Sequence, residues 1–295
     1  MHTFSAMRST AAIRAGNLLL TLATLTAGVG CTAPERSDQG SEAQHADGWT
    51  MQQSFTKQVE NYTFIVPGEG LAFEQRDSLV DACMSAIRKN MTLLGMDAMT
   101  VPYKVKFYPS KAAMKEDVGF GFSGHADYWN KEVGFVVTDD PAVIEAENII
   151  PAPIAHETMH MVAMEQWGFP PENNIWLNEG LATYAANQCN GYTVREVYSH
   201  LLDQGMMLPI DSLLDGFYTR DEMIAYHQAA CIVQYLLEHH DLEQLQALWV
   251  EGADQFEQIY GSTYQELAEQ INADIKAAYP EGVAIDWETF KKGCK

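Results

Sequence analysis

Three residues in the middle of the chain, His156, Glu157 and His160, have types and a spacing suited to metal-assisted chemistry. Two histidines four positions apart on a helix lie one turn apart on nearly the same face, so both imidazoles can bind one zinc ion. The glutamate between them then leans toward the open coordination position, where a general base is needed. The motif predicts a zinc site, and Glu179 in the downstream run Trp176–Gly180 strengthens the prediction.

Each of these assignments has a simpler alternative. The two histidines could be solvated side chains on a helix surface, and Glu179 could be an ordinary surface carboxylate. The apolar Trp176 and Leu177 before Glu179 favour a packed setting. Other histidines later in the chain have no ligand spacing and are expected at the surface or in satisfied polar contacts; they are His125, His200, His227, His239 and His240.

The elements that carry the motif residues are predicted to be helices. Pro151 suits the first turn of a helix that contains both histidines and ends at Gly168. Asn173 or Asn174 can cap a second helix, which carries Glu179 and runs to Cys189. Further helices are expected from the capping patterns Thr219–Glu222 and Ser262–Gln265, running to about His239 and Pro280.

Residues 51–140, in contrast, alternate strand and helix signals. Strand-like runs cover residues 62–66, 101–108 and 132–138, and helical stripes cover 73–94 and 111–117. We therefore predict an α+β fold. An N-terminal mixed α/β sheet lobe (51–145) is expected to pack on a mostly helical lobe (146–295) that carries the zinc site. With 295 residues and 47% hydrophobic content, the chain can bury a sizeable core.

Residues 1–30 are expected to be an export signal. Arg8 and Arg14 precede the mostly apolar stretch Leu18–Val29, which is too short to span a bilayer comfortably. No other segment of the sequence is long and apolar enough to span one. The protein is therefore expected to leave the cytoplasm.

The end of this signal resembles the lipobox of bacterial lipoproteins, because the small Gly30 precedes Cys31. The resemblance implies that Cys31 is lipidated and becomes the mature N-terminus, so that the protein is a periplasmic or cell-envelope lipoprotein. Ordinary signal-peptide cleavage is the alternative and would make the protein secreted. Residues 31–50 are polar and are expected to form a flexible tether.

The composition limits the partners. The chain has 40 acidic against 18 basic side chains, and its net charge is −22. Such a charge repels nucleic acid and anionic membranes, so no nucleic acid is expected, and no membrane contact except through the lipid anchor. A solvated acidic surface is the simplest interpretation, and electrostatic selection of cationic peptides is the other. A monomer is expected.

Four cysteines follow Cys31, in a compartment that permits disulfides: Cys83, Cys189, Cys231 and Cys294. Four thiols allow three connectivities, which the sequence alone does not distinguish. Cys83 shares a helical stripe with apolar residues and is expected to be a buried thiol. If one bridge forms, we expect it between Cys189 and the penultimate residue Cys294, because it would tie down the C-terminal tail.

The predicted order of elements, together with two sequence motifs, resembles that of the gluzincin metallopeptidases. The closer resemblance is to the bacterial peptidase MA-like proteins, distant relatives of the aminopeptidase N family. The first motif combines Ala155–His160 with Trp176–Tyr184, and the second is Tyr226–Glu238, within a resemblance that covers roughly residues 60–280. The glycine-methionine-glutamate-asparagine signature with which aminopeptidases hold a free N-terminus is missing. An endopeptidase is therefore expected.

The resemblance implies a set of roles. The zinc ligands are His156, His160 and Glu179, the general base is Glu157, and Tyr226 donates a hydrogen bond to the transition state. Zinc with two imidazole ligands and one carboxylate keeps a fourth position for water, lowers the pKa of that water from about 16 toward 7 and polarises the substrate carbonyl. A phenol aimed at the developing oxyanion favours the transition state over the bound substrate. The alternative for Tyr226 is a core tyrosine, because it lies on an apolar helical stripe.

The loop Gly119–Trp129, before the strand at 132–138, has a further expected role. In the gluzincin relatives a strand at this point edges the cleft and pairs with the substrate backbone, which gives affinity with little sequence selectivity. The alternative is a hairpin with aromatic packing and no substrate contact.

Taken together, these features predict an exported zinc metallopeptidase that acts on a peptide or protein substrate. The second hypothesis is a catalytically weak or inactive zinc-bound envelope protein that serves binding or assembly and has a peptidase-like fold. Retention of Glu157 favours the enzyme, because a scaffold needs the ligands and not the base. A third hypothesis, a purely structural lipoprotein, requires a zinc site without zinc.

Overall fold

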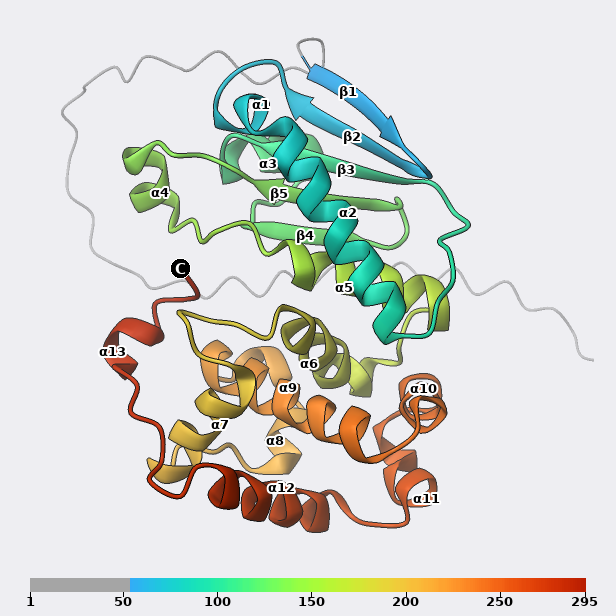
Figure 1. Cartoon of the computed structure of the whole chain (residues 1–295), viewed down its shortest axis with the longest axis vertical. Coiled ribbons are helices and arrows are strands. Elements are labelled where there is room, and N and C mark those ends of the chain that lie inside the picture. The colour runs from blue at the N-terminus through green and yellow to red at the C-terminus, as the bar shows by residue number, and fades with distance from the viewer. Residues whose placement is uncertain (1–53) are drawn as a thin grey trace, which may run out of the picture. The chain divides into compact units, whose positions relative to one another are not determined.

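The computed structural model describes residues 54–295. Within this range a five-stranded sheet is followed along the chain by a series of helices (Figure 1). The expected signal peptide at 1–30, the expected lipid anchor at Cys31 and the expected tether at 31–50 lie outside the described residues. No helix of residues 54–295 combines the length and the apolar character needed to cross a membrane.

The sheet is mixed. Its strands, in spatial order, are β1 (Ser54–Val59), β2 (Tyr62–Pro67), β3 (Tyr103–Tyr108), β5 (Glu132–Val136) and β4 (Gly124–Asp127). The central strands β2, β3 and β5 run parallel, whereas β1 pairs with β2 and β4 pairs with β5 in antiparallel fashion. This sheet, together with the many helices, confirms the predicted α+β class. β4 is the last strand in the order and therefore forms one edge of the sheet.

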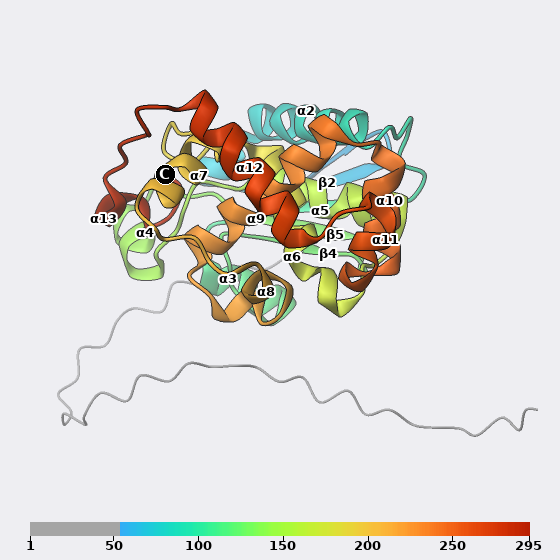
Figure 2. The same cartoon turned by 90° about the horizontal axis from the view of Figure 1, so that it is seen from below.

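The helices fall into two groups along the chain. Between the strands and directly after them come α1 (Leu71–Glu74), α2 (Arg76–Leu93), α3 (Lys111–Val118) and α4 (Pro141–Glu147). The later group contains α5 (Ile154–Trp167), α6 (Ile175–Ala186), α7 (Val194–Asp203), α8 (Ile210–Leu214), α9 (Glu222–His239), α10 (Leu242–Glu251), α11 (Phe256–Tyr260), α12 (Tyr264–Ala278) and α13 (Trp287–Phe290). In this group α12 lies across α7 and α9 (Figure 2).

Different helices cover the two faces of the sheet, because successive side chains of a strand point to opposite faces. Phe64 of β2 and Val105 of β3 belong to the main core, which also contains α2 and α5 (Figure 1). Tyr108 and Val136 belong instead to a smaller cluster with Met114 of α3. Helix α5 contacts β4, α2 and α6, so the predicted metal helix lies between the sheet and the later helices.

The contact between α6 and α9 depends on a glycine. A Cβ atom at Gly180 of α6 would lie 2.9 Å from the carbonyl carbon and oxygen of Ala229 in α9, which is closer than side-chain carbons approach backbone. The neighbouring Leu181 and Ala182 are fully buried. Because Glu179 directly precedes this glycine, the tight packing of α6 on α9 fixes where its carboxylate lies.

The observed helix starts differ from the predicted ones where a neighbouring residue is the better cap. Asp221 caps α9 and accepts a hydrogen bond from the backbone N–H of Ile224, whereas the predicted cap, Thr219, donates to the carbonyl of Gly216. At α12 the capping box is shifted by one residue and uses Thr263 and Glu266. Helix α6 ends at Ala186, before Cys189, because the next residue adopts a left-handed conformation.

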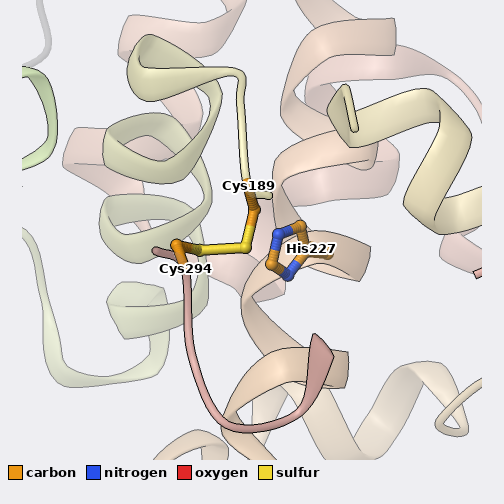
Figure 3. A group of neighbouring side chains, drawn as sticks. All are labelled: Cys189, His227 and Cys294. Carbon is orange, nitrogen blue, oxygen red and sulfur yellow. A yellow bond between two sulfur atoms is a disulfide. The ribbon is translucent and has the colours of Figure 1, made fainter. Parts of the chain in front are cut away.

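A disulfide joins Cys189 to Cys294 and so attaches the C-terminal segment to the region after α6 (Figure 3). The amide of Asn190 adds two hydrogen bonds to the same tail, at Gly293 and Lys295. The expected bridge is confirmed. Cys83, expected as a buried thiol, is buried and free, as is Cys231.

Candidate metal centre

Helix α5 carries three of the predicted site residues and is held firmly by its surroundings. Asn90 of α2 donates hydrogen bonds of 3.0 Å to the carbonyl of Ala155 and to the hydroxyl of Thr158, both on α5. Thr158 is fully buried, and the helix ends at Gly168, whose φ of 81° suits a residue without a side chain. The first turns of α5, which contain the motif, are therefore fixed against α2.

The predicted ligands converge on one point. The Nε2 atoms of His156 and His160 lie 3.1 Å apart, and Oε2 of Glu179 lies 3.3 Å from the first and 3.5 Å from the second. His160 and Glu179 are buried. Four-coordinate zinc with ligand distances of about 2.0–2.2 Å places neighbouring ligand atoms about 3.3–3.6 Å apart. The two distances from Glu179 fall in this range, and the 3.1 Å between the imidazole nitrogens is slightly shorter, so a small shift of one ring would accommodate such an ion.

A neighbouring amide selects the nitrogen that His160 presents to this point. Its Nδ1 atom lies 2.8 Å from Oδ1 of Asn178, which can only accept a hydrogen bond. Nδ1 therefore keeps its proton, and Nε2 is the atom directed at His156 and Glu179, with a lone pair once its own proton is lost. Such a partner for the outer nitrogen is the usual way in which proteins orient a metal-binding imidazole.

The metal-free site is a buried ion pair. Burial alone lowers the pKa of His160, but the carboxylate of Glu179 raises it, and the resulting pKa is about 9. Burial alone raises the pKa of Glu179, but the charge of His160 and contacts with both imidazoles hold it well below its usual range. A metal ion that binds here must displace the proton of His160.

The predicted base, Glu157, is buried and lies against the edge strand. A Cβ atom at Gly124 of β4 would be 2.8 Å from Cγ and 3.0 Å from Oε1 of Glu157, and 2.6 Å from Cγ of Pro153. Only a glycine allows the strand this close to the base. Part of the segment predicted as the loop Gly119–Trp129 is thus strand β4, hairpin partner of β5.

Tyr226 of α9 lies at the same site. Its ring faces that of His156 at a centroid distance of 6.2 Å and an interplanar angle of 20°, and it packs on Phe217 at 5.1 Å. Burial, together with the charge of Glu179, raises the pKa of its phenol, so the hydroxyl stays protonated and can donate. No hydrogen bond of this hydroxyl is found to any residue in the range 54–295.

A second phenol, that of Tyr218, also reaches the site, and no sequence pattern predicts it. The hydroxyl of Tyr218 donates a hydrogen bond of 2.6 Å to Oε1 of Glu179. Tyr218 belongs to the short 3-10 turn Phe217–Thr219 before α9. Nothing in its spacing from the histidines indicates this contact, because the turn meets α6 only through the tertiary fold.

A second group of possible metal ligands lies elsewhere: Cys189, Cys294 and His227 (Figure 3). The two sulfurs form the disulfide, so they are not thiolates. Nδ1 of His227 donates to the carbonyl of Met223 at 2.7 Å, and burial lowers the pKa of the imidazole to about 4. His227 is therefore a neutral, buried histidine that packs beside the disulfide.

Comparison with known proteins gives no family for this chain. No protein-family model matches it, and the search of curated proteins finds no match either. The chemistry must therefore be argued from the residues of the site.

Proposed function

We propose that this protein is a zinc-dependent peptidase. The observation that carries the proposal is the convergence of His156, His160 and Glu179 at distances that fit one zinc ion, with Glu157 on the same helix as the two imidazoles. A bound zinc ion would supply an activated water and polarise the substrate carbonyl. A site that served only to hold the ion would have no use for Glu157.

The protein residues then perform proton transfer and orientation. Glu157 accepts the proton of the attacking water on its carboxylate and passes it to the amine that leaves when the peptide bond breaks. Tyr226 donates a hydrogen bond from its hydroxyl to the substrate carbonyl oxygen, on which negative charge develops. The ring contact with His156 supports this role, because it keeps the phenol beside the ligands.

The order of elements supports a gluzincin-like arrangement. A mixed sheet is followed by the helix of the two histidines, then by the helix of Glu179 and then by that of Tyr226. The edge strand β4, which Gly124 brings against Glu157, is the natural place for an extended peptide to pair by backbone hydrogen bonds. Such pairing suits an endopeptidase, and the net charge of −22 suits cationic peptides.

The proposed place of action is outside the cytoplasm. The export signal at residues 1–30 and the lipobox-like Gly30–Cys31 support an exported lipoprotein. The disulfide between Cys189 and Cys294 fits an oxidising compartment.

The test replaces the base without removing the metal. Glu157→Gln keeps the shape of the side chain but accepts no proton, so hydrolysis of a mixed peptide set should fall by about two to four orders of magnitude. Zinc content should stay at the wild-type level. Glu269→Gln makes the same chemical change on the exposed side of α12 and should leave activity unchanged. Wild-type protein that holds zinc but cleaves no peptide would instead favour the binding or assembly protein.

A further inference from the structure

The two oxygens of the Glu179 carboxylate have different partners. Oε2 faces both imidazoles, at 3.3 Å from His156 and 3.5 Å from His160. Oε1 instead accepts the 2.6 Å hydrogen bond from the hydroxyl of Tyr218. One oxygen is thus directed at the metal position, and the other is held away from it.

The turn that carries Tyr218 is anchored on both sides. The adjacent Phe217 is only 4% exposed and packs on Tyr226, so it fixes the turn in the core. The hydroxyl of Thr219 donates to the carbonyl of Gly216 at 2.7 Å and closes the turn. Arg220 then donates from Nε to the carbonyl of Ser212 at 3.2 Å. The phenol is therefore presented to Glu179 by an ordered segment, although the residue as a whole is 62% exposed.

This arrangement has a consequence for metal coordination. A carboxylate with both oxygens free can bind a metal ion through one or both of them. If Glu179 used both, it would fill the position that a catalytic site needs for water, since such a site has three protein ligands and one open position. A hydrogen bond to Oε1 makes that oxygen a poorer metal ligand, so Oε2 would be the single ligand atom of Glu179.

We propose that Tyr218 is a positioning residue of the metal site, which holds Glu179 as a one-oxygen ligand and thereby keeps the fourth coordination position open. The inference rests on the proposed zinc site and adds a residue that the motif does not contain. Its role differs from that of Tyr226, since Tyr218 acts through Glu179 and not on the substrate. Partners of this kind commonly change metal affinity about 10–100-fold when they are removed.

The experiment compares Tyr218→Phe with wild type in two metal-binding measurements that need no substrate. Zinc affinity is measured by competition with a chelator, and cobalt(II) replaces zinc so that visible absorption reports the coordination number. Tyr235→Phe is the matched control, because it removes a phenol whose hydrogen bond, 3.3 Å to Gln270, lies at an exposed site. Melting temperatures of the metal-free proteins show whether each variant folds.

Tyr218→Phe is expected to lower zinc affinity about 10–100-fold. It should also change the cobalt spectrum from the intense absorption of four-coordinate sites to the weaker absorption of five-coordinate ones. The metal-free variant should stay folded, with a melting temperature a few degrees below that of wild type, because one hydrogen bond to a buried carboxylate is lost. Tyr235→Phe should change none of these quantities.

Three results would overturn the inference, and they separate it from the proposed function. Wild-type affinity and spectrum in a folded Tyr218→Phe variant would remove the positioning role while leaving the zinc site intact. Loss of turnover with unchanged zinc affinity and cobalt spectrum would mean that the Tyr218 hydroxyl acts on the substrate and not through Glu179. Wild-type protein that binds neither zinc nor cobalt would refute the metal site and the role of Tyr218 with it.

Discussion

In the mechanism that we propose, the site residues have unequal roles because each faces a different chemical demand. His156, His160 and Glu179 must present lone pairs to one point, and the structure brings their atoms together. Glu157 must reach a water, and its place one residue after a ligand histidine on α5 provides this. Tyr226 must donate to a charge that exists only in the transition state, so its effect should appear in rate and not in stability.

Tyr226→Phe tests that last point. If the hydroxyl donates to the oxyanion, turnover should fall about 10²- to 10³-fold while the melting temperature and zinc content stay unchanged. The hydroxyl has no hydrogen-bond partner among residues 54–295, so its loss should cost little stability. Tyr235→Phe on the same helix is the control. A lowered melting temperature with normal turnover per folded molecule would show that Tyr226 is a core residue instead.

Zinc affinity should rise with pH, because the metal-free site is an ion pair between protonated His160 and the carboxylate of Glu179. The pKa of His160 is about 9 in the metal-free protein, so at neutral pH this imidazole carries a proton that zinc must displace. Apparent affinity should therefore rise by about tenfold per pH unit between pH 6 and pH 8. Chelator competition at several pH values, corrected for protonation of the chelator, measures the slope. A flat profile would mean that zinc displaces no proton from His160 in this pH range.

At the scale of elements, the site depends on close contacts between α5, α6 and β4. Helix α6 approaches α9 through Gly180, and β4 approaches α5 through Gly124. Both positions hold the backbone of one element against the side chains or backbone of another. The edge strand β4 therefore packs directly against the side chain of Glu157, the proposed base.

Gly124→Ala tests whether the close packing of β4 on Glu157 is needed for activity. The added methyl group would lie 2.8 Å from Cγ of Glu157, so the base must move or the strand must shift. Overpacking of this kind costs about 1–3 kcal/mol of stability, which leaves the domain folded. We expect turnover to fall at least tenfold, because a small displacement of a catalytic group is costly, while zinc content stays normal. Unchanged turnover would show that the contact between β4 and Glu157 does not affect the reaction.

The sequence analysis predicted the helices that carry the motif residues, but it missed helices with local signals of their own, such as α7 with its capping box of Thr193 and Glu196. The spacing of His156 and His160 and the apolar periodicity of the helices are local properties, and α5, α6, α9 and α12 are present close to their predicted positions. Several elements were not predicted: the strands β1 and β4, and the helices α4, α7, α8, α10, α11 and α13. Short edge strands such as Gly124–Asp127 lack a clear alternation, since only one side of them is paired.

The same distinction applies to the site. His156, Glu157 and His160 follow one another on a single helix, so their spacing is enough to identify them. Tyr218 is far from them in sequence, on a turn with no regular period, and only the packing of α6, α9 and the turn brings it to Glu179. A residue that acts through a tertiary contact of this kind leaves no pattern in the sequence.

At the scale of the whole molecule, the described part of the chain is a sheet and a set of helices that share one main core. The disulfide closes a sequence separation of 105 residues, from the end of α6 to the C-terminus, and loop-closure entropy for a loop of that size corresponds to about 4–5 kcal/mol. This covalent link stabilises the region that also contains α9, and hence Tyr226. The net charge of −22 favours solubility and would attract cationic peptides if the protein is the proposed exported peptidase.

Metal analysis of purified protein shows whether His156, His160 and Glu179 of the folded chain hold zinc. Wild-type protein should contain about one zinc per chain, and His156→Ala/His160→Ala should contain almost none while remaining folded, because one remaining carboxylate cannot hold the ion. The matched control, His239→Ala/His240→Ala, removes two neighbouring histidines outside the site and should keep the wild-type zinc content. Stoichiometric zinc in the His156→Ala/His160→Ala variant would show that the two histidines are not the zinc ligands.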